Sequence, residues 1–362
     1  QEGGTGPRLL MTLDAARTAW EEENRCNMDL AFSDLGSTVN VKTVAKVKGT
    51  DEAANGSPTT KTILSNVSGR CQVGRLQAIM GPSGAGKTTL LDILAGRKPQ
   101  SAGKLMLGGE VATGAMIRRY AAYVQQDDAI MASQTAREAV QMAALLTLPR
   151  GMARAAKLER ADRVLTDFQL DSCADTPVGD PVGNMKGLSG GERKRCAVAM
   201  AAVREPKILF LDEPTSGLDA YKAQLLVKLI KSLAQSKPST VIFTVHQPSS
   251  DVFAMFDDLM LLLAGQVVFN STANEAVAHF SNVGFPCPQY ANPADFLFMH
   301  VFTAEDGQAA AGKRQQELVD AWASSALCGD KQELAAEPQA ASQGLPSAAL
   351  AEPARAPGFD IA

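Results

Sequence analysis

The chain has 362 residues, of which 45% are hydrophobic and 20% are charged, so it is long enough to bury a sizeable core in one or two domains. Its formal net charge of -4 argues against a surface built for nucleic acid, and we expect no nucleic-acid partner. The six cysteines include no C-x-x-C pair, which favours reduced thiols, and no apolar run reaches the ~20 residues of a membrane-crossing helix. The chain begins with Gln1 rather than Met, and we expect it to be a piece of something longer.

Residues 1–28 are expected to form an N-terminal extension. The apolar positions between residues 9 and 20 trace one helical face, which fits a helix on the domain's own surface or one that contacts a partner. Residues 29–47 alternate loosely between apolar and polar, as antiparallel strands do. Residues 62–67 resume this pattern after a loop at residues 49–60 that is rich in Gly, Asn, Ser and Pro.

The segment from residue 76 to residue 96 combines a buried strand, a glycine-rich loop and a helix. The loop has the spacing G-x-x-x-x-G-K-[ST] of a phosphate-binding P-loop, in which backbone N–H groups and a helix N-terminus point at a phosphate chain. We expect Lys87 to be a loop charge at the surface that reaches the β- and γ-phosphates, and the Thr88 hydroxyl to ligate Mg²⁺. The predicted phosphate-loop residues are Gly81, Pro82, Ser83, Gly84, Ala85, Gly86, Lys87, Thr88 and Thr89.

The middle of the chain is predicted to be mostly helical. An apolar segment at residues 111–124 precedes two stretches rich in alanine and arginine, at residues 133–148 and 152–168, which favour helices. Residues 175–186 are rich in Gly and Pro and indicate turns. Another helix is expected to run to residue 203.

Two short apolar strands are predicted at residues 208–211 and 241–245. Their hydrophobicity is continuous rather than alternating, which is typical of a parallel sheet buried under helices. Residues 265–269 indicate a terminal hairpin strand. Beyond residue 303 the chain is rich in Ala, Gln, Pro and Glu, and we expect residues 303–362 to be a low-complexity, largely disordered linker.

Asp212 and Glu213 directly follow the first of these two strands. An aspartate at a strand end can hold Mg²⁺ through water or together with Thr88, and the adjacent glutamate can polarise the water that attacks a phosphoanhydride. The alternative is a pair of solvated carboxylates, which fits less well after four buried residues.

Gln126 offers an amide to Mg²⁺ and to the attacking water, so it can sense the γ-phosphate; Gln125 competes for this role. His246 follows the second strand beside the expected site, although a lone histidine is as readily structural. His279 and His300 have no such setting, and we assign them structural roles.

Ser189, Gly190 and Gly191 begin a predicted helix. A hydroxyl and free N–H groups at a helix start can bind an anion. An ordinary helix N-cap is the alternative, but it does not account for the two glycines.

Together these elements resemble the ATP-binding-cassette (ABC) ATPases. Residues 187–192 (GLSGGE) look like the signature motif of that family, and residues 208–214 (ILFLDEP) look like its Walker B strand with the catalytic glutamate. Gln126 fits the Q-loop, residues 216–219 (SGLD) the D-loop, and His246 the switch histidine. The resemblance implies that Glu213, His246 and Gln126 are catalytic, that Thr88, Gln126 and Asp212 hold Mg²⁺, and that Ser189, Gly190, Gly191 and Asp219 contact the nucleotide.

The residues around these motifs resemble the G (White-type) subfamily, and this resemblance covers about residues 29–302. It is carried by the sequences GLSGGERKR, LDEPTSGLDA and HQPSSDVF and by residues 292–296 (NPADF). Two departures stand out: Lys186 replaces the usual Arg before the signature, and residues 269–271 (FNS) replace the usual aromatic-Phe-Gly turn. We assign no aromatic residue to stack on adenine: Phe32 is the nearest aromatic upstream of the P-loop, and residues 39–47 contain none. We therefore expect loose base specificity.

The resemblance implies an α/β fold, a P-loop NTPase of ABC type with a mostly parallel core sheet, an antiparallel β subdomain and an α-helical subdomain. The nucleotide-binding domain would span residues 29–302 and its helical subdomain about residues 128–195. In this family the signature of one subunit binds ATP held by the other. We therefore expect a head-to-tail dimer, homomeric or heteromeric, with Asp219 at the seam.

The function implied is hydrolysis of Mg²⁺-bound ATP that drives export of a lipid-like, sterol or amphipathic substrate. The substrate would pass through a transmembrane domain of the full-length chain, outside the residues given, and the helical subdomain would push on that domain. The ATPase would lie at the cytoplasmic face of a membrane. The alternative is a soluble ABC ATPase acting in translation or DNA maintenance, although the chain has neither the second cassette nor the long coiled-coil insert usual there. A P-loop kinase or GTPase fits less well, because the signature is present and no guanine-reading N-K-x-D follows the P-loop.

Overall fold

The computed structural model describes residues 28–41, 44–45, 54–55, 59–127, 129–180, 185–237, 239–303 and 308–328. The helix expected between residues 9 and 20, most of the loop expected at residues 49–60 and the linker expected after residue 328 lie outside these residues.

Strands and helices alternate along most of the described chain. The strands are β1 (Leu30–Val41), β2 (Val44–Ala45), β3 (Ala54–Asn55), β4 (Thr59–Cys71), β5 (Leu76–Met80), β6 (Ala102–Leu107), β7 (Glu110–Val111), β8 (Ala121–Val124), β9 (Ile208–Leu211), β10 (Thr240–Thr244), β11 (Asp258–Leu263) and β12 (Gln266–Thr272). The helices are α2 (Lys87–Leu94), α3 (Gly114–Tyr120), α4 (Ala136–Thr147), α5 (Arg154–Asp167), η1 (Asp171–Cys173), α6 (Gly190–Ala202), α7 (Ala220–Ser236), α8 (Ser250–Phe253), α9 (Ala273–Asn282), α10 (Pro293–Phe296), η2 (Leu297–Val301) and α11 (Gln308–Ala323).

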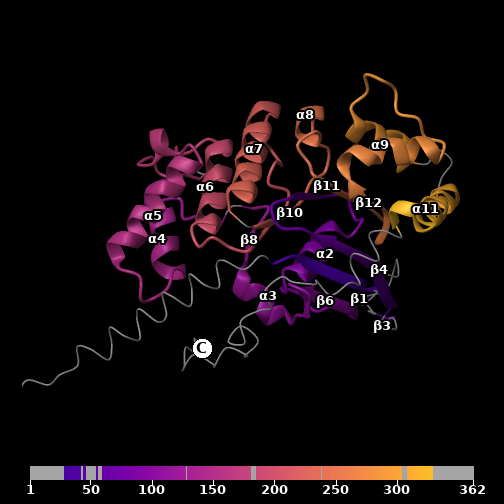
Figure 1. Cartoon of the computed structure of the whole chain (residues 1–362), viewed down its shortest axis with the longest axis horizontal. Helices are drawn as coiled ribbons and strands as arrows, with labels where there is room; N and C mark the ends of the chain where they lie inside the picture. The colour runs from indigo at the N-terminus through magenta and orange to yellow at the C-terminus, as the bar shows by residue number, and fades with distance from the viewer. Residues whose placement is uncertain are drawn as a thin grey trace, which may run out of the picture.

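Six strands form the core sheet in the order β12-β11-β5-β10-β9-β8 (Figure 1). β8, β9, β10, β5 and β11 pair in parallel, and β12 returns antiparallel to β11. Every residue of β5, β9 and β10 is buried, as continuous hydrophobicity predicts for strands covered on both faces. The predicted α/β fold with a mostly parallel core sheet is confirmed.

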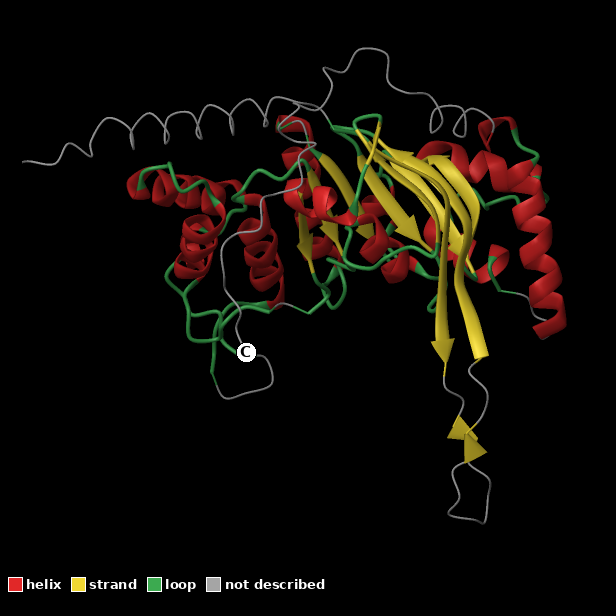
Figure 2. Cartoon of the chain, turned by 90° about the horizontal axis from the view of Figure 1, so that it is seen from below, coloured by secondary structure: helices red, strands yellow, loops and turns green. Residues whose placement is uncertain are grey.

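A second, antiparallel sheet has the order β4-β1-β6-β7. β1 and β4 form a long ladder with several register shifts, and Figure 2 shows long strands lying side by side in this part of the domain. Phe32 lies on β1 and is completely buried, so it belongs to the core and is not available to stack on a nucleotide base.

The helices α4, α5 and α6 gather at one end of the core sheet and form a helical arm (Figure 1). α4 begins with a capping box, in which the Thr135 hydroxyl accepts from the backbone N–H of Glu138 and the Glu138 carboxylate accepts from the N–H of Thr135. It ends where Lys157 of α5 donates to the carbonyl of Leu148 at 2.9 Å. These helices confirm those predicted at residues 133–148 and 152–168.

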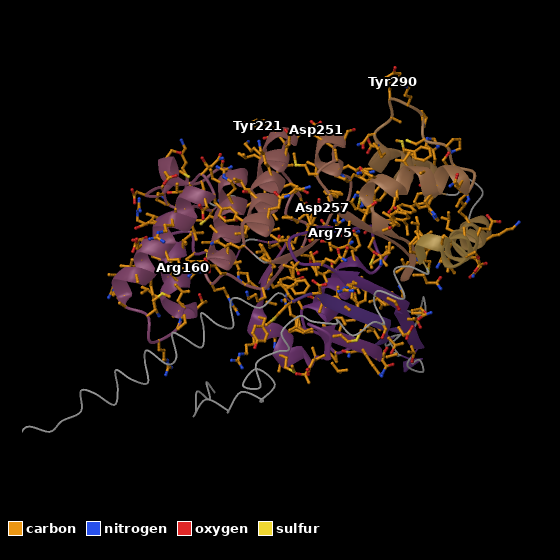
Figure 3. The ribbon with its side chains drawn as sticks, in the orientation of Figure 1. Arg75, Arg160, Tyr221, Asp251, Asp257 and Tyr290 are labelled. Carbon is orange, nitrogen blue, oxygen red and sulfur yellow. The ribbon has the colours of Figure 1, made fainter. Side chains whose placement is uncertain are left out.

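Charged side chains tie the beginnings of β5 and β11 to α7. Arg75 Nη2 donates to Asp258 Oδ1 at 3.0 Å, and the neighbouring Asp257 carboxylate accepts from the N–H of Leu76 at 2.9 Å and from Lys231 Nζ at 2.8 Å. Figure 3 labels Arg75 and Asp257 near the centre of the molecule. The hydrogen bond that Arg75 donates to Asp258 raises the pKa of Arg75 above its usual value. This cluster fixes the start of the strand that leads into the P-loop.

The hairpin between β11 and β12 turns at Ala264 and Gly265, which have φ values of 44° and 83°. Two successive positive φ values suit a tight hairpin turn, and Gly265 adopts its value without a side-chain clash. Residues 269–271 lie inside β12 and pair with β11, not in the turn. The unusual sequence there therefore changes strand residues and leaves the shape of the turn unaffected.

The helix α11 lies within the segment expected to be a disordered linker, so that expectation is wrong for residues 308–323. Leu318 and Trp322 are 1% and 6% exposed, because one face of α11 packs on β12 and α9. The Trp322 ring centroid lies 5.4 Å from that of Phe269 and 5.7 Å from that of His279. His279 is thus structural, as predicted. The alanine- and glutamine-rich composition suggested a linker, although Leu318 and Trp322 are spaced to lie on one face of a helix and are buried.

We expect Trp322→Ala to lower the free energy of unfolding by about 3–5 kcal/mol, because it leaves a cavity against Phe269 and His279. Urea unfolding followed by circular dichroism measures the effect. Tyr290→Ala is the matched control, since Tyr290 is 95% exposed and its loss should change the free energy by less than about 0.5 kcal/mol. Equal stabilities for the two variants would show that α11 does not stabilise the domain.

Candidate functional site

The ends of four parallel strands create the site. β5 leads into the P-loop, β8 into Gln126, β9 into Asp212 and Glu213, and β10 into His246. Because these strands are parallel and adjacent in the core sheet, their carboxyl ends share one edge, where open α/β sheets bind ligands. The topology therefore brings together residues that are up to about 160 positions apart in the chain.

The P-loop is shaped by close backbone contacts. A Cβ on Gly81 would lie 2.2 Å from the carbonyl oxygen of Leu262, and one on Gly86 would lie 2.7 Å from the side chain of Leu64, so neither position admits a side chain. Gly86 has a φ of 100° and directly precedes α2. The loop thus presents its N–H groups at the beginning of a helix, where an anion is stabilised.

Lys87 is buried at the first position of α2, so the prediction of a surface charge is wrong. Its Nζ donates to the carbonyl of Gly81 at 2.8 Å and to that of Pro82 at 3.2 Å, which folds the loop over the ammonium group. Burial lowers the pKa of Lys87, and the carboxylates of Glu213 and Asp212 oppose that shift. The loop holds the ammonium where a phosphate oxygen can replace a carbonyl.

Asp212 is buried and accepts hydrogen bonds from three hydroxyl groups. Thr88 Oγ1 donates to Asp212 Oδ1 at 3.2 Å, Thr244 Oγ1 donates to the same oxygen at 2.7 Å, and the Tyr123 hydroxyl donates to Oδ2 at 3.4 Å. Sequence reasoning predicted the first contact and missed the other two. A signal did exist, because Thr244 ends β10 next to β9 and Tyr123 lies in β8, on the other side of β9.

Thr244 also accepts a hydrogen bond from the backbone N–H of Glu213 at 2.8 Å. One buried hydroxyl thus holds the Asp212 carboxylate and the Glu213 backbone at once. Glu213 has a φ of 45°, a conformation that costs a non-glycine residue energy and is typical of functional sites. The Gln126 side chain donates from Nε2 to Glu213 Oε2 at 3.1 Å, so the two side chains that were each predicted to act on the attacking water are in contact.

Tyr123 is further supported by Arg97, whose guanidinium lies 4.1 Å from the centroid of the tyrosine ring. Burial raises the pKa of Tyr123 well above its usual value, and the nearby Asp212 carboxylate adds to the shift. The phenol therefore stays protonated and able to donate to Asp212. Arg97 was not identified from the sequence, because it lies in the turn after α2 and outside every motif.

His246 is exposed at the end of β10, and its ring stacks on Phe298 with centroids 5.2 Å apart. No hydrogen bond or ion pair joins His246 to Glu213 among the described residues. The structure places His246 on the expected sheet edge, and its catalytic role stays a prediction.

The signature residues lie at the start of α6. The Ser189 hydroxyl accepts from the N–H of Glu192 at 3.4 Å, and the Glu192 carboxylate accepts from the N–H of Ser189 at 2.8 Å, so Ser189 is an N-cap whose O–H can still donate. A Cβ on Gly191 would lie 2.8 Å from the side chain of Lys222 in α7, which explains this glycine by packing. Nothing within 3.4 Å restricts Gly190, whose N–H is one of the free donors of the helix start.

Asp219 caps α7 through the N–H of Lys222 at 2.9 Å and pairs with its ammonium at 2.7 Å. These hydrogen bonds from Lys222 lower the pKa of Asp219. A cavity of about 700 Å³ separates the Q-loop from the signature and D-loop; its lining includes Gln126, Asp127, Gly190, Lys194, Ser216 and Leu218. The predicted elements of one chain thus face a common space.

The oxygen atoms at the sheet edge suit a magnesium ion. The described residues contain no group of three or more His, Cys, Asp and Glu side chains placed to hold a metal. However, Mg²⁺ typically takes one or two protein oxygens together with waters and substrate phosphates. The Thr88 hydroxyl and the Asp212 carboxylate, 3.2 Å apart and beside the P-loop, fit this pattern.

These features define a P-loop nucleotide hydrolase. Comparison with protein-family models agrees: an ABC transporter model matches residues 64–216, and a model of an AAA domain, described as a putative AbiEii toxin of a type IV toxin–antitoxin system, matches residues 183–251. An ABC-2 type transporter model matches residues 246–325. No helix in the described ranges is long and apolar enough to cross a bilayer. This third match was not expected from the sequence, since the transmembrane domain was predicted to lie outside the residues given.

Three relatives illustrate the similarity. The chain is 42% identical to the protein white of Drosophila melanogaster over 76% of its own length and 41% of that protein. It is 40% identical to ABC transporter G family member 13 of Arabidopsis thaliana, over 73% and 39% of the two chains. It is 43% identical to the broad substrate specificity ATP-binding cassette transporter ABCG2 of Bos taurus, over 66% and 36%. The chain spans about two-fifths of the length of these relatives.

The chain therefore contains the ATP-binding domain of an ABC transporter and belongs to the G, or White-type, branch of that family. The family resemblance drawn from the motifs is confirmed, and so is the assignment to ABC-type ATPases.

We expect Thr244→Val to lower kcat for ATP hydrolysis about 10- to 100-fold, because a hydrogen bond to a charged group contributes about 1.5–3 kcal/mol. Valine keeps the shape of threonine but removes the donor to Asp212 and the acceptor for the Glu213 N–H. Steady-state kinetics at saturating ATP measures the effect. Thr244→Ser keeps the hydroxyl and is the control; if it loses as much activity as Thr244→Val, packing rather than the hydroxyl is responsible.

Proposed function

We propose that this domain hydrolyses Mg²⁺-bound ATP and thereby drives export of a lipid-like, sterol or amphipathic substrate through a transmembrane domain, at the cytoplasmic face of a membrane. The observation that carries the proposal is the shared sheet edge, where Lys87, Thr88, Asp212, Glu213 and Gln126 converge. The three G-branch or White relatives, two of them named as transporters, support the transport part.

Each residue of this edge has a separate task. Lys87 and the P-loop N–H groups bind the phosphate oxygens, and Thr88 with Asp212 would hold the magnesium ion, which neutralises charge on the phosphates. Glu213 accepts a proton from the attacking water. Gln126 holds the Glu213 carboxylate and orients the water, and His246 contributes a further polar contact at the γ-phosphate. Each of these roles extends the family pattern to this chain.

The soluble alternative, an ABC ATPase of translation or DNA maintenance, has less support. The ABC-2 transporter match covers residues 246–325, directly after the catalytic elements, and G-branch or White relatives match the same chain. The AAA-domain match covers residues 183–251 and describes only the ATPase elements that both classes share. The transport proposal is therefore favoured.

Glu213→Gln should bind ATP but hydrolyse it at least about 100-fold more slowly, since general-base catalysis contributes typically 10²–10⁴-fold. Glutamine keeps the size of the side chain and a hydrogen bond to Gln126. Calorimetric titration with Mg-ATP and a phosphate-release assay measure the two effects separately. Hydrolysis at the parental rate would assign the base to another residue, and Lys87→Ala, which removes the phosphate contact, serves as the control that loses binding.

We further propose that two copies, identical or related, form a head-to-tail dimer with ATP between the P-loop of one and the signature of the other. In the described part of the chain, no hydrogen bond joins Ser189 to the P-loop of its own subunit. Its O–H and the N–H of Gly190 are free at the start of α6, and Gly190 lines the cavity together with Ser216, Gly217 and Leu218 of the D-loop. Such donors can serve a phosphate bound by a second chain.

Lys87→Ala and Ser189→Arg chains should each be inactive alone and recover part of the parental activity when mixed, because one site of the mixed dimer combines an intact P-loop with an intact signature. Removing a preorganised donor to developing charge costs about 10²–10³ in rate, so the background is low. Phosphate release at fixed total protein measures the recovery. Activity should also rise with protein concentration; a flat profile without recovery on mixing would contradict a shared site.

A further inference from the structure

Lys194 connects the signature helix to the Q-loop of the same chain. It is the fifth residue of α6, its side chain is 7% exposed, and its Nζ donates to the backbone carbonyl of Gln126. A buried ammonium is costly unless polar groups receive its protons, so its position is set by what it contacts. The contact spans 68 residues of sequence and lies beside the cavity that separates the Q-loop from the signature.

The carbonyl that receives this hydrogen bond belongs to the residue whose side chain holds the catalytic carboxylate. Gln126 Nε2 donates to Glu213 Oε2 at 3.1 Å, while Gln126, its neighbour Asp127 and Gln125 are exposed and carry little packing of their own. Lys194 therefore supplies a fixed point for a loop that hydrophobic contacts do not hold.

Lys157 provides a structural comparison within the same helical arm. It is also 7% exposed, and it also donates to backbone carbonyls, those of Leu148 at 2.9 Å and Leu145 at 3.4 Å. These carbonyls lie at the C-terminal end of α4, where the last carbonyl groups of a helix lack helical hydrogen-bond partners and a cation can satisfy them. The two lysines share burial and chemistry, and only Lys194 contacts a residue of the site.

We propose that Lys194 is a positioning residue: it fixes the Q-loop of its own chain so that Gln126 holds Glu213 in place for hydrolysis. The inference rests on the proposed ATPase mechanism. It adds Lys194, which acts on the nucleotide site of its own chain, although the first residues of the same helix act on the site of the partner chain. A single helix thereby serves the nucleotide of its own chain through Lys194 and that of the partner through Ser189.

The first test compares Lys194→Met with Lys157→Met, which removes an equally buried ammonium from the same arm. Lys194→Met should lower kcat about 10- to 100-fold, the range expected for one charge-assisted hydrogen bond, and leave the ATP dissociation constant within about 2-fold. Lys157→Met should lower the unfolding midpoint with little change in kcat. Lys194→Arg, which keeps a donor for the carbonyl, should recover more activity than Lys194→Met.

The second test asks which site of a mixed dimer is affected. In a mixture of Lys87→Ala and Ser189→Arg chains, only the P-loop of the Ser189→Arg chain works. Adding Lys194→Met to that chain should abolish the recovered activity, whereas adding it to the Lys87→Ala chain should leave most of it. Adding Lys157→Met to either chain is the control.

Each outcome has a distinct reading. Loss confined to the Lys87→Ala chain would overturn the inference, because Lys194 would then act through the signature. Equal loss for Lys194→Met and Lys157→Met would overturn it as well, because a loosened arm would explain both. If the parent mixture shows no recovery, the shared site fails. The first test still decides the role of Lys194, since a kcat unchanged by Lys194→Met would refute it.

Discussion

The Asp212 carboxylate is the point on which the site depends. It is buried at the end of β9 and accepts hydrogen bonds from three hydroxyl groups. These belong to Thr88 of the P-loop helix and to Thr244 and Tyr123 of the strands on either side. A buried carboxylate is stable only when its oxygens are satisfied, so these hydroxyls fix where it lies. They can do so because β8, β9 and β10 are parallel and in register. The sheet therefore positions the predicted catalytic elements around one buried carboxylate.

The parts of the fold that follow local rules were predictable from the sequence. The P-loop, the buried strands of the core sheet and the helices of the arm each carry a pattern of spacing or hydrophobicity within one segment, and the parallel topology then dictates that their ends meet. The position of Asp212, Glu213 and Gln126 directly after strands that share one sheet edge could accordingly be predicted, whereas their catalytic roles stay predictions.

Residues that act through tertiary contacts were not predictable in the same way. Thr244 and Lys194 look like an ordinary strand threonine and an ordinary helix lysine, and their importance comes from partners 32 and 68 positions away. Trp322 and Leu318 were hidden in an alanine-rich stretch whose composition resembles a linker. Lys87 was recognised by its motif, but its burial was not predicted, because loop residues are usually exposed. Its burial is seen only in the structure, where the loop folds over the ammonium group and the carbonyls of Gly81 and Pro82 accept its hydrogen bonds.

The carbonyl contacts of Lys87 also bear on how the site binds its nucleotide. A buried ammonium would destabilise the domain if it had no partner, and the two carbonyls provide one within the loop itself. They are neutral acceptors, however, and a phosphate oxygen carries charge, so exchanging one for the other strengthens the interaction at little cost in reorganisation. The Glu213 backbone is held in the same manner, in a strained conformation that Thr244 fixes in advance. Both groups are thus positioned by the fold before the nucleotide arrives, and this preorganisation is what the proposed action of Glu213 and Gln126 on a water molecule requires, since neither side chain must first wait for the loop to rearrange.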